Sequence, residues 1–548
     1  MNKFKITGLD PAGFFVWGIH NPSYEVLNIR RRDFIFPLGH VVSGDLVTNE
    51  INFPKESIIN IRHAQSVYEI PNVFPFWGTS FVLKDKADKF LDSPNKITLM
   101  PKKNSIFKDD DWTVIKDIIK SSKDYSLKDL PRSILITIAI CCEDEELLCE
   151  IAKLSCKLEF SSKSNTPTGI SYEEKNNQLI PIIYDHDLFE SVANNPYLPD
   201  SYKRAMVLNP GVQGRSPIVG DYFNDQVNIF EYLRSNSYIA WGHYASNMAH
   251  DSVRYTVASL TLKDIEGLRH LYYQRTYIRL ANMLKLEFKR RFLDKEELEK
   301  LRISILEKVR LLCSKGESLE FNATLWGWNY GFGFTPTGFR LHASHQQIHQ
   351  QFALIPKEIE QVGRSTQSIN SYAIGDLIAQ LCKEFRCHFN KGLFNTLIKA
   401  IKTNKRTDYR DDVKRSSLIV YEDKNVIIYV PKAQRFQSEV HILTLNPIGN
   451  ILEADIATRA SLDKALLLTI KGLYAMGAKM VTCCEASKRL DDMSKDQHLL
   501  YYLLPKNPIS PGSFSEWQLR WICGHYPEDF AYILSKKIKE IKHKEKIN

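Results

Sequence analysis

The chain has four stretches in which apolar residues recur at helical spacing, residues 143–154, 261–288, 295–312 and 461–477. The second stretch begins with Thr261, and Asp264 follows three residues later, which is a variant of the capping box. Asp294 stands where its side chain can cap the third stretch. The pattern therefore predicts four amphipathic helices, two of which carry a start signal in the sequence.

Shorter apolar runs bounded by turn residues predict β-strands. Residues 418–432 indicate two strands around an Asp-Lys-Asn turn, and residues 497–506 indicate a strand that ends in proline. Residues 72–83 indicate a turn that runs into a strand, and further strand-like runs occupy residues 238–258 and 439–445. The apolar run 134–142 fits either a buried strand or a helix segment, because periodicity alone does not separate the two.

Polar segments divide the chain into three regions, residues 1–156, 181–400 and 417–548. We expect a linker or long loop at 161–180, which is rich in Ser, Thr, Asn and Gly, and a charged linker at 399–416. The two later regions share one order of elements: a strand hairpin, a helix and a strand ending in proline. We therefore predict an α+β fold with two tandem repeats, each an antiparallel sheet with helices on one face, behind an N-terminal domain of unknown role.

Composition excludes several classes of protein. The 548 residues are 43% hydrophobic, so the chain is not disordered as a whole. Lys and Arg exceed Asp and Glu by 73 to 64, and this net charge of +9 is too diffuse for a dedicated nucleic-acid binder but suits an anionic ligand. No apolar window approaches the length of a membrane-spanning helix and the first residues do not resemble a signal peptide, so we expect a cytoplasmic protein without membrane contact.

The ten cysteines do not form a secreted disulfide framework, since no Cys-x-x-Cys occurs and the spacing is irregular. Cys142, Cys149 and Cys156 recur every seven residues, which can place them on one helix face as metal ligands or as buried thiols. Cys483 and Cys484 are adjacent and should point to opposite faces of a strand. Cysteine usage favours a reducing compartment.

Three histidines lie within eight residues, at His342, His345 and His349. On an extended strand one face would carry alternate polar residues, namely His345, Gln347, His349 and Gln351. Such a face is costly to bury without partners but suits a polar ligand, and the preceding glycines allow close backbone approach. Two other interpretations stay open: a solvent-exposed polar strand, and a metal site in which His345 and His349 are ligands.

The run 344–351, SHQQIHQQ, resembles the active-site strand of the galactose-1-phosphate uridylyltransferase branch of the histidine-triad superfamily, which includes dinucleoside polyphosphate and sugar-nucleotide phosphorylases. Ser344 fits the first position of the signature, His349 its second histidine and Gln351 its glutamine. Gln347 replaces the first histidine, and in the uridylyltransferases that histidine can belong to a zinc site. The resemblance therefore implies no metal here and no other cofactor.

The third region also resembles this family. Residues 418–445 are similar to the opening of the family's second repeat, and Phe436 and Glu439 match its aromatic-x-x-Glu step. In the stretch 497–505, Gln497, His498 and Pro505 are similar to the family's closing strand, while tyrosines hold the slots of its histidines. The resemblance covers about residues 200–548 and leaves the first 200 residues unassigned.

The resemblance implies a role for each matching residue. His349 would attack the α-phosphorus of a bound nucleotide and form a covalent nucleotidyl-histidine. Gln351 would donate its amide to a non-bridging oxygen as charge builds there. The substrate-binding candidates are Ser344, Arg340, Asn329 and Gln347. Asn247 and His250 are candidates either to frame the pocket or to hold its structure.

The resemblance thus implies a nucleotidylyltransferase or phosphorylase that acts on a nucleoside diphosphate sugar or a dinucleoside polyphosphate. Its partners would be the nucleotide substrate and a phosphate-bearing acceptor, without nucleic acid, and a homodimer stays open. Two alternatives remain: a non-catalytic nucleotide-binding protein that kept the pocket, and a metal-dependent phosphate-ester hydrolase. Base, sugar and acceptor are not decided by any motif.

Overall fold

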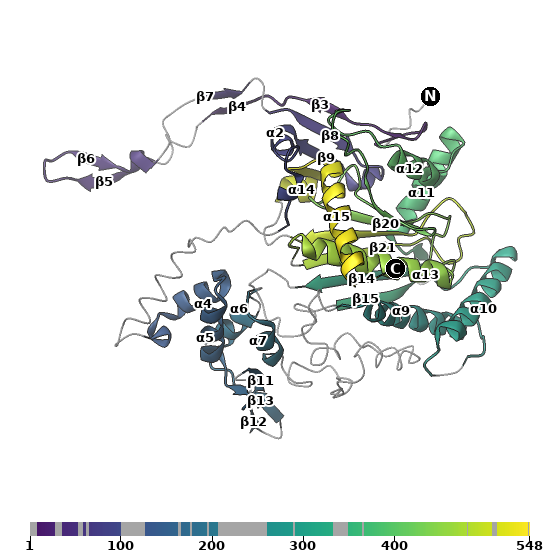
Figure 1. Ribbon diagram of the computed structural model, residues 1–548, viewed down its shortest axis with the longest axis horizontal. Helices are drawn as coiled ribbons and strands as arrows, with labels where there is room; N and C mark the ends of the chain where they lie inside the picture. The colour runs from purple at the N-terminus through teal and green to yellow at the C-terminus, as the bar shows by residue number, and fades with distance from the viewer. Residues whose placement is uncertain are drawn as a thin grey trace.

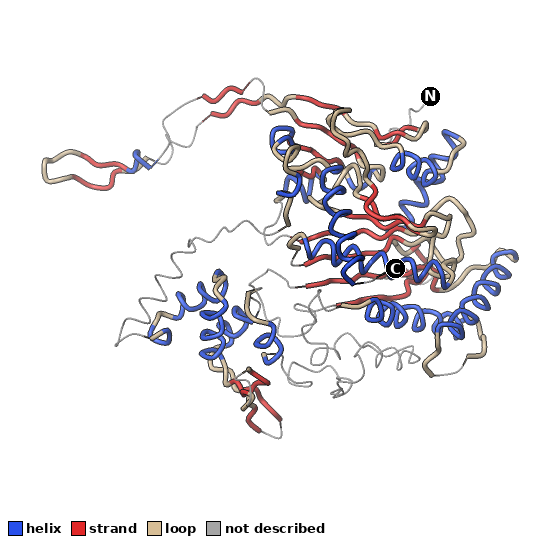
Figure 2. Tube along the Cα trace, in the orientation of Figure 1, coloured by secondary structure: helices blue, strands red, loops and turns tan. Residues whose placement is uncertain are grey.

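The protein is a mixed α+β structure, seen in a computed structural model (Figures 1 and 2). The structure describes residues 8–27, 35–52, 58–61, 65–99, 126–162, 166–175, 178–193, 195, 197–206, 260–288, 291–331, 349–363, 367–478, 480–506, 512–545 and 547. Within these ranges, no helix has the length and apolar character needed to cross a membrane.

A seven-stranded antiparallel sheet lies at the centre, in the order β15-β14-β21-β22-β20-β19-β18. Its strands are β14 (Phe321–Gly331), β15 (His349–Pro356), β18 (Ile419–Glu422), β19 (Val426–Tyr429), β20 (Val440–Thr444), β21 (Met480–Ala486) and β22 (Leu500–Lys506). The predicted hairpin at 418–432 is confirmed, because β18 and β19 pair around the Asp-Lys-Asn turn. Within the part of the chain that is described, β15 is one edge of this sheet.

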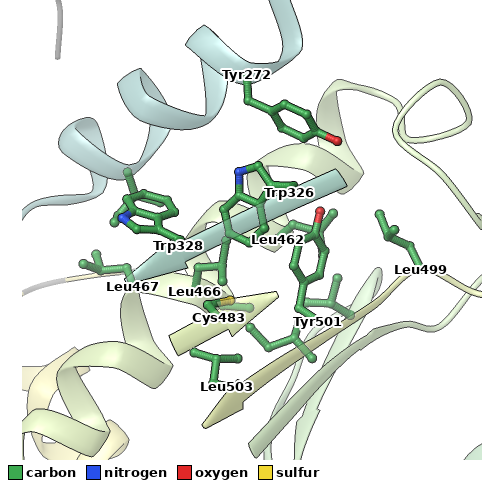
Figure 3. Packing of buried hydrophobic residues seen from close by; sticks show 14 of the residues in the cluster. Tyr272, Trp326, Trp328, Leu462, Leu466, Leu467, Cys483, Leu499, Tyr501 and Leu503 are labelled. Carbon is green, nitrogen blue, oxygen red and sulfur yellow. The ribbon is translucent and has the colours of Figure 1, made fainter. Parts of the chain in front are cut away.

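Long helices cover one face of this sheet: α9 (Leu262–Met283), α10 (Lys295–Ser314), α13 (Ile456–Ala475) and α15 (Pro527–Glu545). The predicted start of α9 is confirmed, since Thr261 and Asp264 form a reciprocal capping box, and Asp294 caps α10 in the same way. Alternate strand residues such as Trp326, Trp328 and Tyr501 meet the helices in a large apolar core (Figure 3).

Among the described elements, the opposite face of the sheet is covered over β18, β19, β20 and the adjoining ends of β21 and β22. There α11 (Ile374–Phe389) and α12 (Leu393–Lys402) pack with an N-terminal segment that holds β1 (Leu9–Asp10), β2 (Phe14–Phe15) and the short 3-10 helix η2 (Pro75–Trp77). Phe74 and Trp77 of this segment lie in the second apolar core with Tyr429 and Leu500 of the sheet. The first hundred residues are therefore built into the same body as the last region.

A second, four-stranded sheet joins the two ends of the chain, in the order β23-β9-β8-β3. It contains β3 (Gly18–His20), β8 (Val67–Pro71), β9 (Thr79–Leu83) and β23 (Arg520–Cys523), with α2 (Lys84–Asp88), η3 (Pro94–Lys96) and α14 (Ser513–Gln518) beside it in sequence. β23 pairs with β9 in parallel. Between β3 and β8 the chain forms a ribbon of β4 (Tyr24–Leu27), β5 (Pro37–His40), β6 (Leu46–Thr48), η1 (Asn49–Asn52) and β7 (Ile58–Ile61), which extends from the body in Figure 1.

Residues 126–206 have an apolar core of their own. Their elements are η4 (Leu127–Asp129), α4 (Arg132–Cys141), α5 (Glu145–Ser155), β10 (Leu158–Phe160), β11 (Pro167–Ile170), β12 (Tyr172–Lys175), β13 (Gln178–Pro181), α6 (His186–Ala193) and α7 (Asp200–Ala205). The expected linker at 161–180 is wrong, because its described residues form antiparallel pairs β10–β11 and β12–β13. The linker was predicted from polar composition. Short exposed hairpins have the same polar composition as linkers, so composition does not distinguish the two.

The structure also decides the conformation of the apolar run 134–142 and the placement of the three regularly spaced cysteines. The apolar run 134–142 is helical through Cys141, and Leu148 of α5 packs in the same core. Cys142 ends α4, whereas Cys149 lies inside α5, so the three regularly spaced cysteines do not share one helix. The chain turns between the helices, and this turn breaks the seven-residue register.

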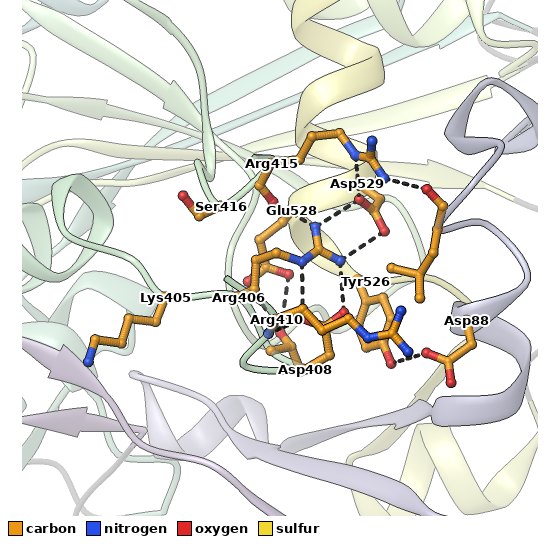
Figure 4. Close-up of polar contacts among 12 residues, drawn as sticks. Asp88, Lys405, Arg406, Asp408, Arg410, Arg415, Ser416, Tyr526, Glu528 and Asp529 are labelled. Atoms are coloured by element: carbon orange, nitrogen blue, oxygen red, sulfur yellow. Dashed lines mark hydrogen bonds and ion pairs between the residues drawn. The ribbon is translucent and has the colours of Figure 1, made fainter. Parts of the chain in front are cut away.

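The expected charged linker at 399–416 is also wrong. Its first residues end α12, and the next ones carry the buried side chain of Arg406. Arg406 binds Asp529 of α15 (Nη1–Oδ1 2.9 Å) and Asp408 (Nε–Oδ1 3.0 Å), as Figure 4 shows. The segment is therefore not a solvated linker throughout, because Arg406 and Arg415 both pair with the buried Asp529, although residues 409–412 are exposed.

A long helix followed by two antiparallel strands occurs twice, as α9, β14, β15 and as α13, β21, β22. The inner strands β14 and β21 pair antiparallel, with Gly327 opposite Cys484. The outer strands carry similar sequences, IHQQFALIPK at 348–357 and QHLLYYLLPK at 497–506. This correspondence places His349 of the first unit at the position of His498 in the second. The remaining elements, β16 (Glu358–Glu360) and β17 (Ser368–Asn370), form a separate hairpin.

Candidate functional site

His349 begins β15, directly opposite Asn329 of β14 in the antiparallel register. Twenty residues of sequence separate the two, and the strand pairing brings their backbones together. The predicted alternation holds in the described part of β15. Gln350 faces the helices, where its amide oxygen accepts a hydrogen bond from Trp326 Nε1 (2.8 Å), and Gln351 is exposed on the other face.

Several predicted site residues lie outside the described part of the chain. These are Arg340, Ser344, Gln347, the histidines at 342 and 345, and the pair Asn247 and His250. For His349 the structure describes the backbone position. Asn329 and Gln351 are described completely, and both lie on strands that carry the same open face of the sheet.

A row of polar positions crosses this open face from β15 to β21. The register aligns His349, Asn329 and Thr482, and we call these three positions the polar row. The Asn329 amide oxygen accepts a hydrogen bond from Thr482 Oγ1 at 2.9 Å. Because this bond fixes the amide plane, the Asn329 NH₂ group remains a donor toward the neighbouring strand position.

The next row on the same face contains a glycine at its centre. Gln351 lies opposite Gly327, which lies opposite Cys484, which in turn lies opposite Tyr502. Among the described residues, a Cβ at position 327 would come within 4 Å only of the Cys483 carbonyl oxygen, at 3.8 Å. Because Gly327 has no side chain, a ligand can approach the backbone of β14 between Gln351 and Cys484.

Two basic residues that sequence reasoning missed bound this face on the side of β22, and we call Arg435 and Lys506 the basic wall. The Arg435 guanidinium is stacked between Trp77, at 3.7 Å from the ring centroid, and Tyr502, at 4.5 Å. Lys506 Nζ lies 4.7 Å from the centroid of the Phe436 ring. The available signals were the Pro-Lys end of β22 and the aromatic-x-x-Glu step beside Arg435, neither of which indicates a cationic site by itself.

A buried hydrogen-bonded chain fixes Arg435. Its Nε donates to Glu439 Oε1 at 3.0 Å, His441 Nε2 lies 2.7 Å from the same oxygen, and Tyr429 Oη lies 3.0 Å from His441 Nδ1. Burial by itself raises the pKa of Glu439, but the charge of Arg435 and the contacts with His441 outweigh burial and bring this pKa to about 2. Glu439 is therefore a permanent carboxylate that holds Arg435 in place.

Cys484 and Lys506 have shifted acid–base equilibria on the same face. Burial raises the pKa of the Cys484 thiol, so it stays protonated near neutral pH. Burial, with the nearby charge of Arg435, lowers the pKa of Lys506. The confirmed separation of the cysteine pair follows from strand alternation, because Cys483 lies in the helix-side core and Cys484 on the open face.

His498, which corresponds to His349, occupies a closed counterpart of the site. Its Nδ1 lies 2.7 Å from the Thr444 carbonyl oxygen, and its ring stacks on Phe394 with centroids 5.1 Å apart. Burial lowers the pKa of His498, so the ring is neutral at physiological pH and donates Nδ1–H to that carbonyl. Phe394 of α12 covers this ring, whereas the face near β14 and β15 has no such helix among the described elements.

A metal site was one of the alternatives that the sequence left open. Among the residues that the structure describes, no three His, Cys, Asp or Glu side chains lie close enough together to hold a metal ion.

Comparison with known proteins adds structural likeness only. The sequence matches no protein-family profile and no curated protein. Three similar solved structures are a uridylyltransferase (15% identity, 45% of this chain and 69% of that chain, TM-score 0.32), a GalT-like protein from Arabidopsis thaliana (13%, 44% and 70%, 0.30) and an ADP-glucose phosphorylase from Arabidopsis thaliana with bound ADP-glucose (13%, 44% and 66%, 0.30).

Proposed function

We propose that the protein is a nucleotidylyltransferase or phosphorylase that forms a covalent nucleotidyl-histidine at His349. The observation that carries this proposal is the pairing of His349 with Asn329 on the open face of the sheet, one row from Gly327. The register places three features next to one another: the nucleophilic residue type at His349, the amide donor of Asn329 and the backbone of Gly327. Such a constellation suits an anionic ester better than a structural role.

The proposed reaction has two balanced steps. The neutral imidazole of His349 attacks the α-phosphorus of a nucleoside diphosphate sugar or dinucleoside polyphosphate, so that an N–P bond forms and the bridging P–O bond breaks. The leaving group departs as a sugar phosphate or nucleotide. An oxygen of a phosphate-bearing acceptor then attacks the same phosphorus, and the N–P bond breaks to regenerate the free histidine.

The supporting residues have complementary tasks in this proposal. Gln351 and Asn329 carry amide donors that can meet the non-bridging oxygens as negative charge develops, and one such preorganised donor contributes roughly 3 kcal/mol. An amide does not exchange protons at neutral pH, so Gln351 favours transfer to the acceptor over hydrolysis. Ser344, Arg340 and Gln347 remain proposed phosphate contacts from the preceding segment.

The second unit supports the proposed tautomer of His349. At the corresponding position, His498 Nδ1 is held by a backbone carbonyl oxygen at 2.7 Å, which leaves Nε2 as the nucleophilic nitrogen. We infer that the two helix-and-strand units are tandem histidine-triad-like repeats and that the second has lost access to substrate because Phe394 covers it. The proposal further takes the active protein to be a metal-free enzyme and leaves its oligomeric state to solution measurement.

The deciding experiment is labelling of the purified protein with a panel of radiolabelled nucleoside diphosphate sugars and dinucleotides, without acceptor. We expect an acid-labile, base-stable label on His349 that is lost in His349→Ala and retained in His345→Ala. Gln351→His should still be labelled, but its intermediate should pass to water more often, because a protonatable group then stands beside the phosphorus.

Two results would replace this proposal. Tight binding of a nucleotide without label or turnover would indicate a non-catalytic nucleotide-binding protein. Turnover that needs one tightly bound metal ion per chain, with both His345 and His349 required, would indicate the hydrolase alternative.

A further inference from the structure

We propose that the basic wall, Arg435 and Lys506, is an anion subsite that binds the phosphate group of the second substrate. This inference deepens the proposed function and rests on it for the identity of the substrate, but anion binding itself can be tested without any turnover. Three observations support it: the guanidinium of Arg435 is fixed, Lys506 has no ionic partner among the described residues, and both lie on the face of the sheet that also carries His349.

Arg435 is preorganised and has donor capacity left over. Its Nε and Nη2 both bind one oxygen of Glu439, and its backbone N–H donates to the other oxygen at 2.6 Å. Trp77 and Tyr502 hold the two sides of the guanidinium plane. Nη1 makes no hydrogen bond in the described structure and is not sealed in the interior, so it can donate to an incoming anion.

Lys506 is half-buried, and among the described residues it has neither an ion pair nor a hydrogen bond. A buried ammonium normally has a partner, because removal from water without one is unfavourable. Burial and the charge of Arg435 lower its pKa more than nearby groups such as Glu516 raise it. A bound phosphate would add negative charge beside the ammonium.

The chain provides a matched lysine for comparison. Lys357 follows Pro356 at the end of β15 as Lys506 follows Pro505 at the end of β22. Lys357, however, is partly exposed and donates to Ser318 Oγ at 3.1 Å, with Glu358 3.7 Å away. The same sequence position therefore carries a lysine with polar partners in one unit and, in the other, a lysine without an ion pair or hydrogen bond among the described residues.

The location of the basic wall favours binding of the acceptor's phosphate over binding of the phosphate that His349 attacks. Lys506 lies opposite Met480, one row beyond the polar row, and three strand spacings of about 4.8 Å separate β15 from β22. This span of roughly 14 Å between the strand backbones leaves room for an extended ligand between His349 and Lys506. An extended acceptor whose far phosphate sits on the wall can reach across Cys484 and Gly327 to the nucleotidyl group.

The first test uses pyridoxal 5′-phosphate as an aldehyde-bearing phosphate probe. A neutral lysine amine condenses with the aldehyde and releases water, and borohydride then reduces the imine to a stable secondary amine that peptide mass spectrometry can locate. We expect labelling of Lys506 at least about tenfold faster than that of Lys357, and protection of Lys506 by inorganic pyrophosphate but not by sodium chloride at equal ionic strength. Equal labelling of the two lysines, or no protection beyond that of chloride, would overturn the proposal.

The second test measures pyrophosphate binding by titration calorimetry. Lys506→Met should weaken binding by about tenfold or more, whereas Lys357→Met should leave it unchanged. Arg435→Lys, which keeps a charge against Glu439, should also weaken binding, because Nη1 is lost. If Lys506→Met binds pyrophosphate as tightly as the unmodified protein, the basic wall is not an anion subsite.

One variant separates the two proposals. His349→Ala should lose nucleotidyl labelling but retain pyrophosphate binding and its protection of Lys506. Absence of labelling in the unmodified protein, with pyrophosphate binding intact, would refute the covalent mechanism and leave the anion subsite standing. Normal labelling together with absent pyrophosphate binding would do the reverse.

Discussion

Arg269 and Asp463 face each other in the interior, with Arg269 Nε 3.3 Å from Asp463 Oδ1, and they hold corresponding positions on two helices. Each lies eight residues after the N-cap of its helix, Thr261 for α9 and Asp455 for α13. Arg269 also donates to the hydroxyl groups of Tyr273 and Tyr501. The two helix-and-strand units are therefore joined by the buried Arg269, which pairs with Asp463 and lies 3.9 Å from Glu485 Oε2.

The first prediction concerns this pair. Arg269→Met should lower the free energy of unfolding by about 3–5 kcal/mol, because Asp463 and Glu485 then remain buried without a counter-charge. Burial already raises the pKa of Asp463 to about 7, so the lone carboxyl would take up a proton. The double variant Arg269→Met with Asp463→Leu should cost less than the sum of the single variants in urea unfolding. Lys263→Met, an exposed change on α9, serves as control, and additive single effects would contradict this interpretation.

The second prediction concerns pH. His525 is buried, its Nε2 has no hydrogen-bond partner, and burial lowers its pKa to about 4. Because the unfolded chain binds a proton near pH 6.5 and the folded chain only near pH 4, folding is favoured above pH 6.5 and loses about 3 kcal/mol as the pH falls through this window. His525→Leu should flatten this part of the stability curve, measured by urea unfolding between pH 4 and pH 7.

The control for this pH dependence is His543→Leu, which removes an exposed histidine from the end of α15. It should leave the slope unchanged. An unaltered slope in His525→Leu would show that other groups cause the loss of stability in acid.

The third prediction tests the ionic network of Figure 4. Arg406→Met should destabilise the fold by about 3–5 kcal/mol, since it leaves the buried side chain of Asp408 without its cation and Asp529 with Arg415 alone. Lys405→Met, one residue earlier and exposed, should change stability by less than about 0.5 kcal/mol. Chemical denaturation measures both, and equal effects would mean that the segment is a solvated linker after all.

The fourth prediction separates a functional glycine from a structural one. Gly327→Ala should fold with unchanged or slightly higher stability, because the new Cβ meets nothing closer than 3.8 Å, whereas Gly327→Leu should lower turnover at least about tenfold without lowering the melting temperature. Gly375→Ala should instead destabilise by about 1–3 kcal/mol, since its Cβ would lie 1.8 Å from the Ser487 carbonyl oxygen. A normal turnover rate in Gly327→Leu would remove the open face from the proposed site.

Much of the fold can be predicted from local pattern. Thr261, Asp264 and Asp294 mark helix starts that the structure confirms, because capping depends on residues three positions apart. The alternation in β15 likewise follows from backbone geometry alone. The hairpins near residues 161–180 escaped prediction, since short exposed strands and linkers have the same polar composition.

The candidate site is only partly local. SHQQIHQQ points to His349 and Gln351, but the position of Asn329 opposite His349 depends on the register of β14 and β15. Arg435 and Lys506 are seventy residues apart, and each looks like an ordinary surface charge in the sequence. Their common face is decided by pairing of β20, β21 and β22.

The sequence by itself determined four of the helices, the strand alternation and the nucleophile candidate, because these depend on spacings of two to four residues. Only the tertiary structure decided which charges are buried, since Arg406 and Arg269 meet their partners from segments more than one hundred residues away. It also decided that residues 79–83 and 520–523 share one sheet. Burial and charge pairing are properties of surfaces that meet after folding, and no local pattern specifies which surfaces those are.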